Sequence, residues 1–240
     1  MLDSTAYGND GTCSGMSAAN QAIGPLDGAV SFDGVNDFVN CGSKTSLNTP
    51  DDYTIEMWVY NDAGAKKYPT LFNRGPQNGS DGYFWSYILT GDPTTLWFQF
   101  ATGSGTVARS FAGALPENEW SHIAFTFEDA TKELTLFRNG VQLGSTILTG
   151  SLPVDDDTFY LGTYYGGTSN YPFDGILDEA RLSDIARSPE WLLASYRFMA
   201  EDHLSFGVEQ TPEPTTLTLL GLGALALVRR RRRAPTHPHR

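Results

Sequence analysis

Acidic side chains in strand-like stretches are the first candidates for chemistry, because two carboxylates aimed into one cleft can hydrolyse a glycosidic bond. A strand presents alternate residues on one face, so such a pair needs a spacing like Glu-x-Asp-x-x-Glu. The sequence contains no such string: Glu56 stands alone in its stretch, and Asp178 and Glu179 are adjacent and expected on opposite faces. We therefore predict that the protein is not an enzyme, with a glycan hydrolase that uses loop carboxylates as the remaining catalytic alternative.

Histidine and serine patterns point the same way. The sequence has no Gly-x-Ser-x-Gly nucleophile elbow, and its only histidines at metal-like spacing are His237 and His239 near the end. His122 lies in an apolar, strand-like stretch between Trp120 and Ala124, which favours a packed structural histidine.

Asp178 is the best candidate for a calcium ligand. Its expected strand face is otherwise apolar, so a bare carboxylate there would be costly without a cation, an arginine or backbone donors. The residues expected on that face are Ile176, Ala180 and Leu182. Calcium prefers oxygen ligands, and Asp3, Asn9 and Asp174 could complete a structural site if the chain ends meet. Alternatively, Asp178 accepts backbone N–H groups and Glu179 pairs with Arg181.

Aromatic and amide side chains provide the candidate sugar-binding site. The stretch 162–171 is rich in glycine and tyrosine, and tyrosine rings can stack on sugar rings while amides donate hydrogen bonds. The predicted ligand-binding residues are Trp85, Tyr87, Trp97, Tyr164, Tyr165, Asn170 and Tyr171. In the alternative interpretation, these aromatic side chains fill the core or cover a turn.

The elements that would position these residues are mostly short strands. Residues 53–60 alternate between two faces, both partly apolar, and further strands are expected around residues 28–34, 38–41, 83–89 and 95–100. The later strands are expected at 120–128, 133–138, 141–145, 159–162 and 173–182, with a type I′ turn at Asn139-Gly140. One helix should begin after Ser188, with Pro189 in its first position, and run to about residue 196. About a dozen strands and one helix predict an all-β, two-sheet antiparallel jelly-roll sandwich.

Six motifs in order strengthen this prediction. They are Asn9-Asp-Gly-Thr12, Ser31-Phe-Asp-Gly-Val-Asn-Asp-Phe38, Tyr53-Thr-Ile-Glu-Met-Trp58, Trp120-Ser-His-Ile-Ala124, Leu136-Phe-Arg-Asn-Gly140 and Phe173-Asp-Gly-Ile-Leu-Asp-Glu-Ala-Arg181. Together they resemble a LamG-like jelly roll of the concanavalin A-like lectin/glucanase superfamily. The resemblance implies two antiparallel sheets with one concave face, and a module that binds carbohydrate or protein.

The C-terminal segment has a different composition. Pro212-Glu213-Pro214 precedes a charge-free apolar run, 217–228, and an arginine cluster that includes Arg229, Arg230 and Arg231. Twelve helical residues reach only about 18 Å, less than the ~30 Å hydrocarbon core, so a transient anchor is favoured over a permanent span. The arginines should stay on the cytoplasmic side, which places the preceding residues outside the cytoplasm.

This segment resembles the bacterial PEP-CTERM sorting signal, which implies an exosortase-type membrane protease as a partner. Export also requires a signal peptide, and Met1-Leu2-Asp3 opens without one, so we expect the natural start to lie elsewhere. The predicted organisation is a jelly-roll domain at 1–207, a linker at 208–216, a hydrophobic sorting helix with its arginine cluster at 217–233 and a disordered tail at 234–240.

Charge and cysteine content narrow the function further. Six of the 16 Lys and Arg residues lie after residue 228, so the rest of the chain carries 10 cations against 28 acids, which disfavours nucleic-acid binding. The sequence contains two cysteines, Cys13 and Cys41. In an exported protein they could form one disulfide, and the alternative is two free thiols.

We predict an extracytoplasmic protein, at the cell surface or secreted, that binds a polysaccharide without catalysis. The alternative from another class is a structural or adhesive module that binds proteins of the biofilm matrix.

Overall fold

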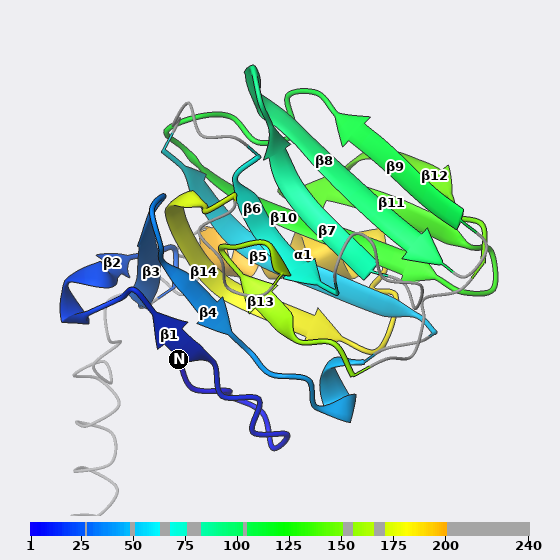
Figure 1. The fold of residues 1–240 in the computed structure, drawn as a ribbon. Helices are drawn as coiled ribbons and strands as arrows, with labels where there is room; N and C mark the ends of the chain where they lie inside the picture. The colour runs from blue at the N-terminus through cyan, green and yellow to red at the C-terminus, as the bar shows by residue number, and fades with distance from the viewer. Residues whose placement is uncertain are drawn as a thin grey trace, which may run out of the picture. The chain divides into compact units, whose positions relative to one another are not determined.

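Two antiparallel sheets pack face to face in the computed structural model, which describes residues 1–26, 28–48, 51–62, 68–75, 83–102, 105–150, 156–165 and 171–200 (Figure 1). Each sheet has seven strands within these residues. The strands of sheet A, in spatial order, are β1 (Thr12–Ser14), β4 (Phe38–Asn40), β13 (Phe159–Leu161), β6 (Thr70–Arg74), β7 (Tyr83–Leu89), β8 (Asp92–Thr102) and β9 (Gly105–Phe111). Those of sheet B are β12 (Val141–Ile147), β11 (Glu133–Arg138), β10 (Trp120–Glu128), β5 (Tyr53–Asn61), β14 (Asp174–Ser183), β3 (Gly28–Asp33) and β2 (Gln21–Ile23).

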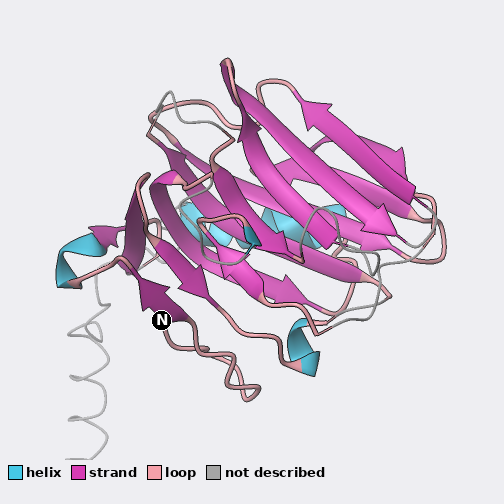
Figure 2. Ribbon diagram, viewed as in Figure 1, coloured by secondary structure: helices cyan, strands magenta, loops and turns pink. Residues whose placement is uncertain are grey.

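The predicted all-β jelly-roll sandwich is therefore confirmed, and Figure 2 shows how little helix accompanies the strands. The short 3₁₀ helices η1 (Ala18–Asn20) and η2 (Thr45–Leu47) lie in connections. Strands β1, β2, β6 and β9 were missed from the sequence, and β1 and β2 have only three residues each. Strand β6 ends in Asn73 and Arg74, and β9 carries mostly small or polar residues, so neither shows an apolar alternation.

Aromatic side chains fill the space between the sheets. Phe72 of β6 is buried and packs edge-on against Phe125 of β10 in the opposite sheet, with ring centroids 5.7 Å apart. It also contacts Phe84, Phe98 and Phe159 of its own sheet. Edge-to-face and offset arrangements of this kind add to the free energy gained from area burial.

Helix α1 (Pro189–Ala200) covers the outer face of sheet B. Ser188 caps it, since its Oγ accepts a hydrogen bond from the Trp191 N–H at 3.3 Å, and Leu192 and Met199 are buried. The start of the helix is as predicted, and its end lies about one turn further on. Tyr196 packs against Trp58 of β5 in a tilted arrangement, with ring centroids 5.6 Å apart, so both faces of β5 are covered, as its sequence indicated.

A β-bulge in β14 corrects one prediction from the sequence. Asp178 pairs with Trp58 and Arg181 with Glu56, so the register shifts between them, and Glu179 has a positive φ of 49°. The extra residue turns Ala180 and Leu182 toward the core side, where they pack against the core, while Asp178 stays on the outer face. The expected common face of Asp178, Ala180 and Leu182 was therefore wrong.

The C-terminal segment with Pro212, Glu213, Pro214, Arg229, Arg230 and Arg231 lies outside the described residues. Residues 1–201 form one compact unit by themselves. No helix within the described part of the chain combines the length and apolar character needed to cross a bilayer.

Candidate functional site

A second aromatic cluster lies on the outer face of sheet A, apart from the core between the sheets. Along β7, Phe84 and Ile88 belong to the core, and the alternate residues Trp85 and Tyr87 point to the other face. The register places Gln99 opposite Trp85 and Trp97 opposite Tyr87. The cluster, named here the outer aromatic cluster, consists of Trp85, Tyr87 and Ala101 with Tyr68, Leu89, Trp97, Tyr164 and Tyr171 packed on them.

The rings of this cluster touch one another across three parts of the chain. Trp85 lies 4.2 Å from Tyr87 and 4.7 Å from Tyr164, measured between ring centroids. Trp97 of β8 stacks on Tyr87 at 5.9 Å, and Tyr171 lies 5.6 Å from Trp85. The fold thus joins five of the predicted ligand-binding residues: Trp85, Tyr87, Trp97, Tyr164 and Tyr171.

The loop that carries Tyr164 and Tyr171 is closed at its base by the strands. The Phe173 N–H donates to the Gly162 carbonyl at 2.9 Å, and the Gly162 N–H donates to the Leu71 carbonyl at 3.0 Å. Gly162 has a φ of 78°, and a Cβ there would lie 2.3 Å from the Phe32 ring, so only glycine fits at this position. The loop base is therefore fixed to the core as well as to β6.

Burial divides the cluster into a foundation and a rim. Trp85 and Tyr87 are only 4% and 7% exposed, and the Trp85 indole N–H donates to Thr70 Oγ1 at 2.9 Å. Tyr68, Trp97, Tyr164 and Tyr171 are half-buried, so part of each ring faces solvent. A ligand would contact the rim, and the foundation would support it.

Trp97 is half-buried and lies next to edge strand β9. Its neighbour on β9 is Ser110, which is small and exposed, and Ala108 beside it is also exposed. Tyr87 stacks against the other side of Trp97. A flat apolar ring bordered by small, uncharged residues is suited to the apolar face of a sugar ring.

Two predicted residues do not join the cluster. Tyr165 packs edge-on against Tyr160 of β13, with ring centroids 6.4 Å apart, and is not among the cluster residues. Asn170 lies outside the described residues. Tyr68 was missed by sequence reasoning, because its neighbours Lys67 and Pro69 are typical of a polar loop. An aromatic residue beside Pro in such a loop is the only signal that could have found it.

Three of the four predicted calcium ligands, Asp3, Asn9 and Asp178, line one cavity, and each already accepts hydrogen bonds from the protein. Asp3 accepts the N–H groups of Thr5 and Asn9, which lower the pKa of its carboxyl. Asn9 Oδ1 accepts the Ser46 hydroxyl at 2.8 Å. Asp174 starts β14 opposite Asp33 of β3.

Asp178 accepts backbone N–H groups with both of its oxygens. Leu26 donates to Oδ2 at 3.1 Å and Glu179 to Oδ1 at 2.8 Å, while Glu179 pairs with Arg181. This is the alternative that the sequence left open. Nowhere in the described ranges do three or more His, Cys, Asp or Glu residues gather in a metal-binding geometry. A calcium ion there would have to displace these donors, and its binding stays a prediction.

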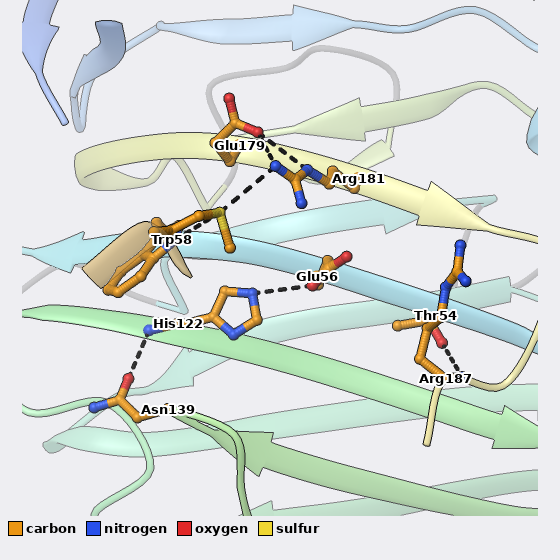
Figure 3. Close-up of polar contacts among 9 residues, drawn as sticks. Thr54, Glu56, Trp58, His122, Asn139, Glu179, Arg181 and Arg187 are labelled. Atoms are coloured by element: carbon orange, nitrogen blue, oxygen red, sulfur yellow. Dashed lines mark hydrogen bonds and ion pairs between the residues drawn. The ribbon is translucent and has the colours of Figure 1, made fainter. Parts of the chain in front are cut away.

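A buried polar pair lies under helix α1. Glu56 Oε2 and His122 Nε2 are 3.1 Å apart, and both residues are about 1% exposed (Figure 3). The His122 ring lies against Trp58 and Tyr196, which separate the pair from solvent. Because the pair is buried, it cannot contact a substrate, and its role is structural. His122 is therefore the structural histidine that its sequence context indicated.

The two cysteines are free thiols, so the predicted disulfide is wrong in this structure. The register pairs Cys13 with Val39, so Cys41, which follows the last residue of β4, lies two residues past that partner and diagonal to Cys13. A diagonal pair is not aligned for a disulfide, which needs close and well-directed Cβ atoms. Burial raises the pKa of the Cys41 thiol to about 12.

Comparisons with known proteins agree with this geometry. The family described as the concanavalin A-like lectin/glucanases superfamily matches residues 33–192. The chain belongs to this superfamily. A PEP-CTERM protein-sorting motif matches residues 210–233, so the resemblances noted in the sequence are confirmed. This motif points to export from the cytoplasm. A search among curated proteins found no match.

Solved structures of similar fold include several binding domains. Domain 4 of the extracellular arabinanase AbnA from Geobacillus stearothermophilus, in complex with arabinotriose, has a TM-score of 0.58 and 18% identity, covering 80% of this chain and 82% of that one. The CBM40 domain of a Ruminococcus gnavus sialidase, bound to α2,3-sialyllactose, has a TM-score of 0.55 and 17% identity, with 70% and 92% coverage. The binding domain of Paraclostridial Mosquitocidal Protein 1 has a TM-score of 0.64 and 16% identity. The match covers 82% of the present chain but only 49% of that one. At these identities the likeness concerns the fold.

Proposed function

We propose that the protein is an exported, non-catalytic carbohydrate-binding protein whose ligand contacts the rim of the outer aromatic cluster. One observation carries this proposal: aromatic residues from β7, β8 and the loop after β13 gather on the face of sheet A that is not used for the core. Domains of similar fold that hold arabinotriose or sialyllactose add support.

The C-terminal segment would deliver the protein. The apolar run 217–228 inserts transiently into the inner membrane, the arginines stop its transfer, and an exosortase-type membrane protease removes the segment there, on the protein's way to the cell surface. Replacing Arg229, Arg230 and Arg231 by alanine in an exosortase-containing host tests this. We expect unprocessed protein to accumulate in the membrane fraction, and normal processing would contradict the role of the arginines.

Ligand binding is tested with the full chain on a glycan array that includes arabinotriose and α2,3-sialyllactose. We expect specific binding that Trp97→Ala abolishes. Trp191→Ala is the matched control, because Trp191 is an exposed tryptophan of α1 that packs against Arg187, on the other sheet. Loss of binding in both variants would point to misfolding or to another surface.

A second candidate function is a structural or adhesive module of the matrix. Edge strand β12 exposes Val141, Leu143 and Ile147 by 61%, 40% and 61%, and an apolar edge strand is a surface on which protein chains can associate. Silence on the array together with concentration-dependent self-association in light scattering favours this role. Replacing the three residues by lysine should then abolish the self-association.

A further inference from the structure

Two tyrosines of the outer aromatic cluster have an unusual backbone. Tyr68 has a φ of 53° and Tyr171 a φ of 62°, in the left-handed region that bulky residues rarely adopt. The other non-glycine residues with positive φ within the described ranges are Asn118, Lys132, Asn139 and Glu179. Asn139 lies in the β11–β12 turn and Glu179 in the β14 bulge, where such a conformation is expected.

These two tyrosines come from separate loops and meet at the same place. Their ring centroids are 5.4 Å apart, in an edge-to-face arrangement. Tyr68 lies over Tyr87 at 5.2 Å, and Tyr171 lies over Trp85 at 5.6 Å. Two of the six non-glycine residues with positive φ within the described ranges therefore lie on the rim of the candidate site, and their rings touch each other.

Thr70 connects both tyrosines to the foundation of the cluster. Its hydroxyl accepts the Trp85 indole N–H at 2.9 Å and donates to the Tyr68 carbonyl at 3.2 Å. Its backbone N–H donates to the Tyr171 carbonyl at 3.0 Å. Thr70 is fully buried, so these bonds are shielded from water, and the Tyr68 N–H is held in addition by Thr90 Oγ1 at 3.1 Å.

We propose that Tyr68 and Tyr171 are the paired rings that contact the sugar and determine specificity, and that Thr70 is the residue that positions them. The inference rests on the proposed carbohydrate-binding function. Backbone strain persists where the surrounding structure enforces it, and it gathers at ligand-binding sites because it presets the binding geometry. Two rings fixed before binding lose little conformational freedom when a sugar docks on them.

A covering role alone does not account for the strained backbone. Half-buried rings could shield Trp85 and Tyr87 from an ordinary backbone conformation, without the cost of a left-handed one. The hydrogen bonds of Thr70 hold the peptide groups of both tyrosines, so they fix where the rings stand. Preorganisation of this kind is what a binding site requires of its supporting residues.

The test compares Thr70→Val with Thr70→Ser in the full chain. Valine keeps the shape and the backbone N–H but loses both hydroxyl hydrogen bonds, and serine keeps the hydroxyl. Affinity is measured by calorimetry for the tightest-binding oligosaccharide of the array, and near-ultraviolet circular dichroism reports the packing of the cluster. We expect Thr70→Val to weaken binding by about tenfold or more, as loss of a preorganised site would do, and Thr70→Ser to restore wild-type affinity.

A second pair of variants separates contact from covering. Tyr68→Asn and Tyr171→Asn keep a residue that tolerates positive φ but remove the ring. If these rings contact the sugar, each variant loses binding while the thermal midpoint stays near that of the wild type. Unchanged affinity with a lowered midpoint would show a covering role and overturn the inference.

The remaining outcomes are also decisive. If the wild-type chain binds sugar and Thr70→Val binds equally well, the positioning role is wrong, although the proposed function stands. Equal loss in Thr70→Val and Thr70→Ser would likewise overturn the role of the hydroxyl. If the wild-type chain binds no glycan on the array, the proposed function fails and the paired contact fails with it.

Discussion

Glu56 and His122 lie on neighbouring strands and face each other under helix α1, with Oε2 and Nε2 3.1 Å apart and both side chains about 1% exposed. Among the described residues, neither Glu56 Oε1 nor His122 Nδ1 has a hydrogen-bond partner, so each residue depends on the other. A buried polar pair of this kind costs desolvation, and removing one partner exposes the full cost.

His122→Leu should therefore lower the free energy of unfolding by about 3 kcal/mol or more, because Glu56 is left buried and unpaired. The double variant Glu56→Leu with His122→Leu should recover much of this loss, because neither polar side chain is then left buried without its partner. Urea denaturation of all variants checks the prediction. A double variant that loses the sum of both single losses would contradict it.

Asp178 should make the stability depend on pH. Burial raises the pKa of its carboxyl, although the N–H groups of Leu26 and Glu179 act in the opposite direction. A raised pKa in the folded state means that the folded protein binds more protons than the unfolded chain, so its stability falls as pH rises above the ordinary range of aspartate. In Asp178→Asn this contribution is absent.

The free energy of unfolding of the wild type relative to Asp178→Asn should consequently fall as the pH rises above about 4, the ordinary pKa of aspartate. Denaturation at several pH values measures this difference. A difference that rises with pH would show that hydrogen bonding to the carboxylate outweighs its burial.

Cys41 should react slowly with iodoacetamide. Burial raises the pKa of its thiol to about 12, so the reactive thiolate is scarce at neutral pH, whereas Cys13 is exposed. Mass spectrometry of the native protein should find Cys13 labelled first. Equal rates at the two cysteines would mean that the segment around Cys41, just after β4, opens readily.

Calcium binding by Asp3, Asn9, Asp174 and Asp178 can be tested by thermal melts with calcium and with chelator. If the ion binds as the sequence predicts, saturating calcium should stabilise the fold by about 2–3 kcal/mol, and Asp178→Asn should remove the effect. Identical thermal midpoints of the wild type with calcium and with chelator would show that calcium does not bind at these residues.

The sequence predicted the fold class and part of the site correctly, but not every strand or its register. Alternation along β7 placed Trp85 and Tyr87 on one face, and a period of two is a strong signal. The bulge at Glu179 was hidden, because one extra residue in a strand leaves no mark in the pattern of residue types.

Loop residues were harder to place than strand residues. Tyr164 and Tyr165 are adjacent and chemically alike, and only the course of the loop decides that Tyr164 faces Trp85 while Tyr165 faces Tyr160. Tyr68 reaches the site through a left-handed backbone. Thr70, which is buried, and Thr90, which is 22 residues away in the chain, hold this backbone by hydrogen bonds. Such tertiary contacts cannot be seen in a single sequence.

The affinity of Trp97→Ala for the tightest-binding oligosaccharide, set beside that of Trp191→Ala, tests the central claim most directly. Trp97 lies on the rim of the outer aromatic cluster of sheet A, whereas Trp191 lies in helix α1, which covers sheet B. We predict that Trp97→Ala weakens binding at least about tenfold, or ~1.4 kcal/mol, while Trp191→Ala binds as the wild type does. Undiminished binding by a folded Trp97→Ala variant would contradict the assignment of this surface.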